Sequence, residues 1–93
     1  PNTNIVLQAI YPVNSHLSII ARQMVGKRSN KKILAINKEL HKIALDSKVQ
    51  WLDLTKVLSD ERGRLAKEYS FDGLHLNAQG FEIVSENIIP LLK

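Results

Sequence analysis

Two residues near the end of the chain have the types and the spacing needed for general acid–base chemistry. Asp72 and His75 lie three positions apart, with Gly73 and Leu74 between them. A histidine can take up and return a proton near neutral pH, and a carboxylate bonded to its ring fixes the tautomer and stabilises the imidazolium. A tight turn at Gly73 would bring the Asp72 carboxylate to Nδ1 of His75 and leave Nε2 facing outward. The pair is therefore a candidate acid–base site.

The spacing alone leaves a second interpretation open. Asp-x-x-His is common by chance, and Asp before Gly is frequent in turns. In this case Asp72 caps a turn and His75 is only an exposed side chain. The other histidines, His16 and His41, are far from His75 in sequence and show no metal-binding spacing. The sequence therefore predicts no metal site.

Two short apolar runs predict the strands that would support this loop. Residues 5–11 are mostly apolar and rich in β-branched side chains, and Pro12 ends the run. Such a run is typical of a parallel strand that is buried on both faces. Residues 48–54 form a second run, in which Trp51 is predicted to be a core residue. Residues 12–29 are predicted to be an irregular connection with room for a helical turn.

The clearest predicted helix covers residues 30–46. Ser29 or Asn30 can cap it, because a short side-chain oxygen can accept hydrogen bonds from free backbone N–H groups. Apolar residues recur at spacings of three and four and define one apolar face. These residues are Ile33, Ile36, Leu40, Ile43 and Ala44.

A last helix is predicted from residue 78 to about residue 92, with Asn77 as its cap and a kink or an early end at Pro90. Its predicted apolar face consists of Phe81, Val84, Ile88, Leu91 and Leu92. Residues 55–58 could add one short helical turn. The order strand, helix, strand, helix is typical of an α/β fold with a parallel sheet.

Composition excludes several classes of protein. The chain has 93 residues, of which 44% are hydrophobic and 24% are charged, and this balance excludes a disordered tail, a collagen-like repeat and a coiled coil. The absence of cysteine excludes disulfides, thiolate metal sites and cysteine nucleophiles. No apolar run approaches the roughly 18 residues that span a bilayer. The sequence is compatible with either a cytoplasmic or an exported protein.

The positive charge suggests an alternative function. The formal net charge is +4, and Lys27, Arg28, Lys31 and Lys32 lie within six positions. This cluster could be the contact surface of a non-catalytic interaction or nucleic-acid-binding module. The five aromatic residues do not interleave with it, so a stacking surface for single strands is not supported. We therefore predict a solvated loop and helix start, and no nucleic-acid partner.

The residues around the Asp–His pair resemble a known family. Residues 69–81 read YSFDGLHLNAQGF, which is similar to the last block of the SGNH or GDSL-type esterases and lipases, D-G-x-H-x-N-x-x-G-[YF]. Residues 5–14 resemble the preceding strand, which ends in Pro-x-Asn. Residues 37–54 resemble the helix and strand that follow it.

The resemblance implies a fold and a function. Asp72 would be the orienting acid and His75 the general base of a Ser-His-Asp triad that hydrolyses a small-molecule or lipid ester, with no cofactor. Asn77 would serve the loop and the helix cap, and Gly80 and Phe81 would seat the last helix. The implied fold is the C-terminal βαβα part of a three-layer, doubly wound parallel sheet of the flavodoxin-like SGNH type.

The nucleophile block of the family is absent. No G-D-S block and no G-x-N-D oxyanion block occurs in the sequence. Residues 1–93 are therefore expected to be the C-terminal fragment of a single hydrolase domain, incomplete and inactive on its own. Unpaired strand edges and exposed apolar faces lead us to expect that the fragment self-associates or pairs with a missing N-terminal half.

Overall fold

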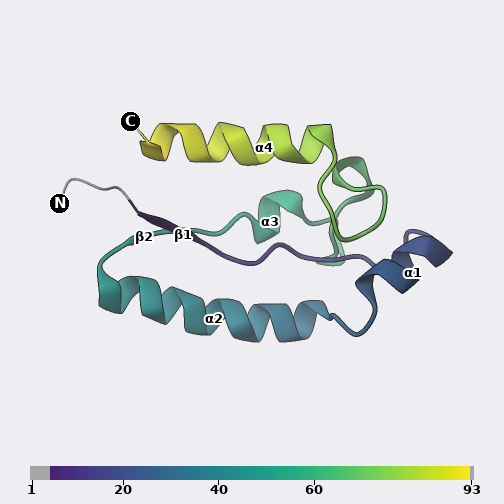
Figure 1. Cartoon of the computed structure of the whole chain (residues 1–93), viewed down its shortest axis with the longest axis horizontal. Helices are drawn as coiled ribbons and strands as arrows, with labels where there is room; N and C mark the ends of the chain where they lie inside the picture. Colours follow the sequence, from purple (N-terminus) through teal and green to yellow (C-terminus); the bar gives the residue numbers. More distant parts are fainter. Residues whose placement is uncertain (1–4, 93) are drawn as a thin grey trace.

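The computed structural model describes residues 5–92, and it is an α/β arrangement with a two-stranded parallel sheet. Helices lie on both sides of the strands, with α4 on one side and α2 on the other (Figure 1). The predicted order of strand, helix, strand, helix is confirmed. The elements are β1 (Val6–Gln8), α1 (Ile19–Val25), α2 (Asn30–Ser47), β2 (Gln50–Leu52), α3 (Thr55–Leu58), η1 (Lys67–Tyr69), α4 (Ala78–Ile88) and η2 (Ile89–Leu92).

The two strands are shorter than the sequence predicts. Val6 pairs with Gln50 and Gln8 pairs with Leu52, and the Ala9 N–H adds a hydrogen bond of 2.9 Å to the Leu52 carbonyl. The ladder ends there because an amide side chain of α2 takes over the backbone groups of Ile10. The prediction that the first strand is buried on both faces is wrong, since β1 is half-buried throughout.

Helix α2 begins where predicted, with Ser29 as its N-cap. The face of α2 that packs on the rest of the chain differs from the predicted apolar face, because Asn37 is buried while Ile36 and Ile43 are about half exposed. The Asn37 amide accepts from the Ile10 N–H at 2.7 Å and donates to the Ile10 carbonyl at 3.0 Å. These two bonds require Asn37 to face the strand, so its neighbour Ile36 turns outward.

The connection between β1 and α2 contains a full helix rather than a single turn. The Ser18 hydroxyl caps α1 by accepting from the Ala21 N–H at 3.0 Å. Helix α1 buries Ala21 and Val25, while Ile19 and Ile20 are exposed. The helix therefore covers one end of the molecule, beside the loops that follow the strands (Figure 1).

Helix α4 begins at its predicted cap. Asn77 accepts from the Gly80 N–H at 2.9 Å, and the α-helix ends at Ile88, before a 3-10 turn that contains Pro90. Val84 is buried, but Phe81 is 60% exposed, so its predicted place on the apolar face is wrong. The side chain of Leu92 lies outside the part that the structure describes.

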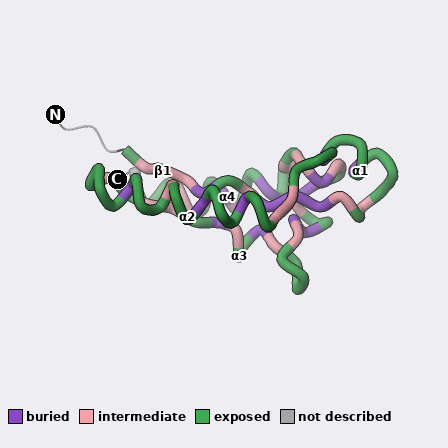
Figure 2. The backbone as a smooth tube through the Cα atoms, turned by 90° about the horizontal axis from the view of Figure 1, so that it is seen from below, coloured by how far each residue is buried: buried purple, intermediate pink, exposed green. Residues whose placement is uncertain are grey.

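The buried residues gather where the strands end and the loops pack (Figure 2). One cluster contains Leu54, Leu58, Leu65 and Val84, and a second contains Val13, Val25 and Ile33. Trp51 was predicted in the core but is only half-buried, and its ring stacks on exposed His41 with centroids 4.9 Å apart. No helix within residues 5–92 has the length and apolar character to cross a bilayer.

Candidate acid–base site

The structure brings Asp72 and His75 into direct contact. Oδ2 of Asp72 lies 2.7 Å from Nδ1 of His75. The other carboxylate oxygen, Oδ1, accepts from the backbone N–H groups of Leu74 at 2.9 Å and His75 at 2.7 Å. One carboxylate therefore organises both the backbone of the turn and the orientation of the imidazole.

Ser70 and Gly73 fix the buried side of the turn. Ser70 is buried, and its hydroxyl accepts from the Gly73 N–H at 2.9 Å and donates to Oδ1 of Asp72 at 3.3 Å. Gly73 has φ +75°, which favours glycine, and a Cβ there would lie 1.9 Å from the Asn14 carbonyl oxygen. The Asn14 N–H also donates to the Gly73 carbonyl at 2.8 Å. The loop is thus fixed to the chain segment that follows β1.

The same contacts stabilise the charged form of the carboxyl group. The hydrogen bond from the His75 side chain, followed by the backbone N–H groups of His75 and Leu74, holds the pKa of Asp72 well below its usual range. Partial burial opposes this shift and is outweighed. Asp72 is therefore an anion at neutral pH, and its Oδ2 accepts a hydrogen bond from Nδ1–H of His75.

The imidazole is presented to solvent. The His75 side chain is 69% exposed, and its Nε2 has no hydrogen bond to residues 5–92. With Nδ1 directed at Asp72, the Nε2 lone pair is available to accept a proton from outside the loop. The pair is arranged for general-base chemistry, as its residue types allow.

The residues after His75 place the loop on α4. Asn77 donates its backbone N–H to the Tyr69 carbonyl at 2.8 Å and its Nδ2 to the Glu68 carbonyl at 2.9 Å. Gly80 packs against this turn so closely that a Cβ would lie 2.8 Å from the Tyr69 oxygen. Asn77 and Gly80 therefore seat the helix, whereas exposed Phe81 does not contribute as expected.

Solved structures share the fold of this chain. A Streptococcus pneumonia protein provisionally designated a platelet activating factor is 35% identical, with a TM-score of 0.89 over 98% of this chain and 42% of that one. A GDSL-like lipase of Bacteroides thetaiotaomicron is 20% identical, with a TM-score of 0.75 over 96% of this chain and 42% of the lipase. A Bacteroides fragilis protein provisionally assigned as an acylhydrolase is also 20% identical, with a TM-score of 0.77 over 96% and 41%. The chain has an SGNH/GDSL-type hydrolase fold.

The chain spans about two fifths of the length of the solved structures that it matches. Among curated proteins, an N-acylneuraminate cytidylyltransferase of Escherichia coli is 36% identical over 44 residues, which are 47% of this chain and 10% of that enzyme. No protein-family model matches the sequence. The likeness to the two Bacteroides proteins concerns the fold alone.

Sequence reasoning missed the structural role of two asparagines, Asn14 and Asn30. Asn14 is buried and donates from Nδ2 to the Leu65 carbonyl at 3.1 Å, while its backbone holds Gly73. Asn30 bonds both backbone groups of Val13, at 2.8 and 2.9 Å. The sequence held one signal for this role. Asn14 lies two residues after Pro12, where the apolar strand ends and backbone groups need hydrogen-bond partners from side chains.

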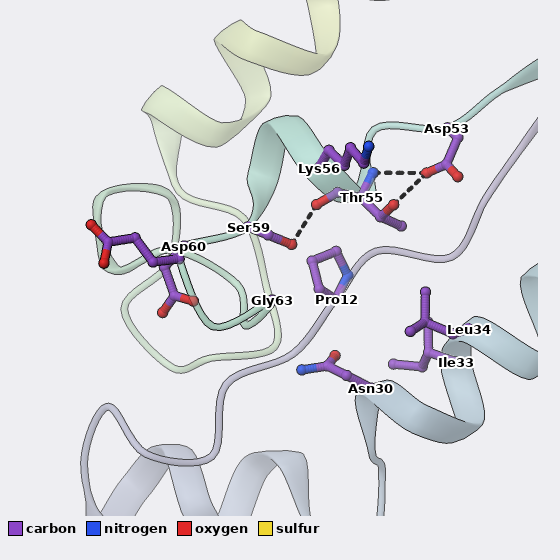
Figure 3. A pocket seen from close by; sticks show the side chains of 11 residues that line it. Pro12, Asn30, Ile33, Leu34, Asp53, Thr55, Lys56, Ser59, Asp60 and Gly63 are labelled. Carbon is purple, nitrogen blue, oxygen red and sulfur yellow. Dashed lines mark hydrogen bonds between the residues drawn. The ribbon is translucent and has the colours of Figure 1, made fainter.

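A cavity of about 650 Å³ also opens at the carboxyl ends of the strands, but it does not contain the Asp–His pair (Figure 3). Two of its three carboxylates, those of Asp53 and Asp60, are engaged within the loops, and the third belongs to exposed Glu61. Asp53 accepts from the backbone N–H and the hydroxyl of Thr55 at 2.9 and 2.6 Å, and Asp60 accepts from the Arg62 and Arg64 N–H groups at 2.8 and 3.1 Å. Asp53 and Asp60 therefore close turns, and no histidine lines the cavity to pair with a carboxylate.

The basic cluster lies where α1 ends and α2 begins. Lys27, Arg28, Lys31 and Lys32 are all exposed, as the prediction of a solvated loop and helix start requires. Arg28 Nη1 donates to the Met24 carbonyl at 3.2 Å and the Val25 carbonyl at 3.1 Å, so it closes the end of α1. In the described part of the chain, no group of three or more His, Asp or Glu side chains could hold a metal ion.

Proposed function

We propose that this chain supplies the Asp–His part of the active site of a serine ester hydrolase. The observation that carries the proposal is the 2.7 Å contact between Oδ2 of Asp72 and Nδ1 of His75, on an SGNH/GDSL-type fold. In this assignment His75 is the general base, and Asp72 orients the ring and stabilises the imidazolium.

The proposed reaction proceeds through an acyl-enzyme. Nε2 of His75 takes the proton of a serine hydroxyl, whose oxygen attacks the ester carbon. The carbon–oxygen bond to the alcohol then breaks, and the alcohol leaves with the proton returned by His75. Water, activated by the same nitrogen, releases the acid and restores the serine. The substrate class is a carboxylic ester, and no cofactor enters the reaction.

The serine comes from outside residues 1–93 in this proposal. None of the chain's serines lies in a nucleophile block, and the best placed, Ser70, is buried and bonded to Gly73 and Asp72 beneath the loop. An oxyanion hole must also be supplied, because hydrolysis needs donors aimed at the developing negative charge. The 93-residue chain alone is therefore expected to be inactive.

The test is hydrolysis of p-nitrophenyl acetate by the full-length gene product that contains this segment. We expect His75→Ala to lower kcat/KM by about 10³-fold or more, because the general base is lost. His41→Ala is the matched control, since His41 is exposed on α2 and its ring stacks on Trp51 instead of contacting a carboxylate. A His75→Ala protein that keeps the wild-type rate would contradict the proposal.

A further inference from the structure

We propose that a small cationic pocket beside the Asp–His loop binds a carboxylate or phosphate group carried by the substrate. The pocket has a volume of about 200 Å³, enough for one oxyanion group, and its lining includes His16, Arg28 and Arg64. The assignment to substrate rests on the proposed ester hydrolase function, whereas oxyanion binding itself does not. No acidic residue lines the pocket.

Arg28 is held in place before any ligand arrives. Its Nη1 donates to the carbonyls of Met24 and Val25 at the end of α1, at 3.2 and 3.1 Å. A guanidinium has five N–H donors in a planar fork, so donors on Nη2 and Nε remain for a planar or tetrahedral oxyanion. Less side-chain freedom is therefore lost on binding than for an unattached surface arginine.

Arg64 reaches the pocket from the segment between α3 and η1. It is half-buried next to Leu65, whose backbone donates to the Val13 carbonyl at 3.2 Å, beside the pocket. Asp60 lies beside Arg64 and accepts from its backbone N–H at 3.1 Å. Burial raises the pKa of Asp60, but the backbone N–H groups and the charges of Arg64 and Arg62 together lower it. Asp60 thus shares its charge between several donors.

Asp60 offsets the positive charge of the pocket only in part, because it interacts with the charge of Arg64 but forms no ion pair with its guanidinium. The two ion pairs found within residues 5–92 join Lys42 to Glu39 and His75 to Asp72, so no described carboxylate forms an ion pair with the guanidinium of Arg28 or Arg64. Asp60 contacts Arg64 through the backbone N–H, at 3.1 Å. A concave site lined by one sign of charge attracts the opposite charge more strongly than a flat surface does. The hydroxyls of Ser15 and Ser29 add polar groups to the wall, although Ser29 already caps α2.

The pocket is joined directly to the catalytic candidate. Asn14 lines it, and the Asn14 N–H donates to the Gly73 carbonyl at 2.8 Å. Gly73 precedes His75 by two residues, a chain distance of at most about 7 Å. We therefore expect an ester with an acidic group a few bonds from its reacting carbon to reach both places. The geometry favours acidic esters over neutral ones.

Binding is tested on the full-length gene product that contains this segment, with inorganic phosphate and, separately, acetate, each titrated at constant ionic strength and followed by the backbone amide signals of Ser15, His16 and Ser29. We expect saturable shifts, and we expect Arg64→Gln to weaken phosphate binding about 10-fold or more. Lys32→Gln, a matched loss of one exposed charge nearby, should change it less than about twofold. Arg64→Lys, which keeps the charge, should fall between them.

Shifts that grow linearly without saturation would overturn the proposal that the pocket binds an oxyanion. Equal weakening of phosphate binding by Lys32→Gln and Arg64→Gln would also overturn it. The substrate part is tested with the full-length gene product and two esters. One is the p-nitrophenyl monoester of a dicarboxylic acid, which keeps a free carboxylate, and the other is the uncharged p-nitrophenyl ester of the monocarboxylic acid of equal chain length. Arg64→Gln should lower the ratio of kcat/KM, acidic over neutral, about 10-fold, and Lys32→Gln should leave it unchanged.

The two proposals fail in different ways. If His75→Ala leaves both ester rates intact, the hydrolase assignment falls while saturable phosphate binding still supports the pocket. If His75→Ala abolishes both rates but Arg64→Gln leaves the ratio unchanged, the hydrolase assignment stands and the substrate assignment is overturned.

Discussion

The loop Ser70–Asn77 and the two long helices use their side chains in opposite ways. In the loop, polar contacts over a few residues engage Ser70, Asp72 and Asn77, and the side chains of Phe71 and His75 face solvent. On α2 and α4, apolar residues at helical spacing stand partly in solvent, and Ile36 and Phe81 are 47% and 60% exposed. Local hydrogen bonds therefore define the loop, whereas hydrophobic periodicity overstates what the helices bury.

The largest expected effect falls on the loop. In Gly73→Ala the new Cβ would lie 1.9 Å from the Asn14 oxygen at a φ of +75°, so we expect a loss of about 3 kcal/mol or more in the free energy of unfolding. Gly63→Ala is the matched control, because Gly63 has φ +76° but nothing within 4 Å of its Cβ, and should cost only about 1 kcal/mol. Urea unfolding measures both, and equal losses would show that the contact with Asn14 does not matter.

The next effect tests which residue seats α2 on the strands. Asn37→Ala removes two hydrogen bonds to the backbone of Ile10, and we expect a loss of about 2 kcal/mol. Ile36→Ala should cost less, because Ile36 is about half exposed. If Ile36→Ala caused the larger loss in the free energy of unfolding, the packed face of α2 would follow the apolar periodicity instead of Asn37.

These two residues mark how far the sequence can predict the structure. The order of elements, the Ser29 and Asn77 caps and the turn at Gly73 were predictable, because each depends on residues a few positions apart. The inward turn of Asn37 was not, because its partner Ile10 lies 27 positions away and the amide competes with two neighbouring apolar side chains. The rotation of a helix is set by such distant contacts.

A smaller effect, on pH dependence, tests the carboxylate of the loop. The folded pKa of Asp72 lies below its unfolded value, so the ion contributes stability above about pH 4, and this contribution is lost as the pH falls. We expect the advantage of the wild type over Asp72→Asn, on the order of 1 kcal/mol at pH 6, to shrink by pH 3. His75→Gln should reduce this pH dependence, since the His75 side chain is its largest cause. An advantage that does not change with pH would contradict the assignment.

The smallest effect is expected on the outer surface of α4. Phe81 is 60% exposed and Val84 is 8% exposed, although both belong to the same apolar periodicity. Phe81→Ala should change the free energy of unfolding of the 93-residue chain by no more than about 0.5 kcal/mol, despite removing a large ring. Val84→Ala removes far less volume but should cost about 1.5 to 2.5 kcal/mol, because Val84 packs in the cluster with Leu54, Leu58 and Leu65. Thermal unfolding of the two variants side by side gives the answer, and a Phe81→Ala loss equal to that of Val84→Ala would mean that the aromatic ring is covered in solution.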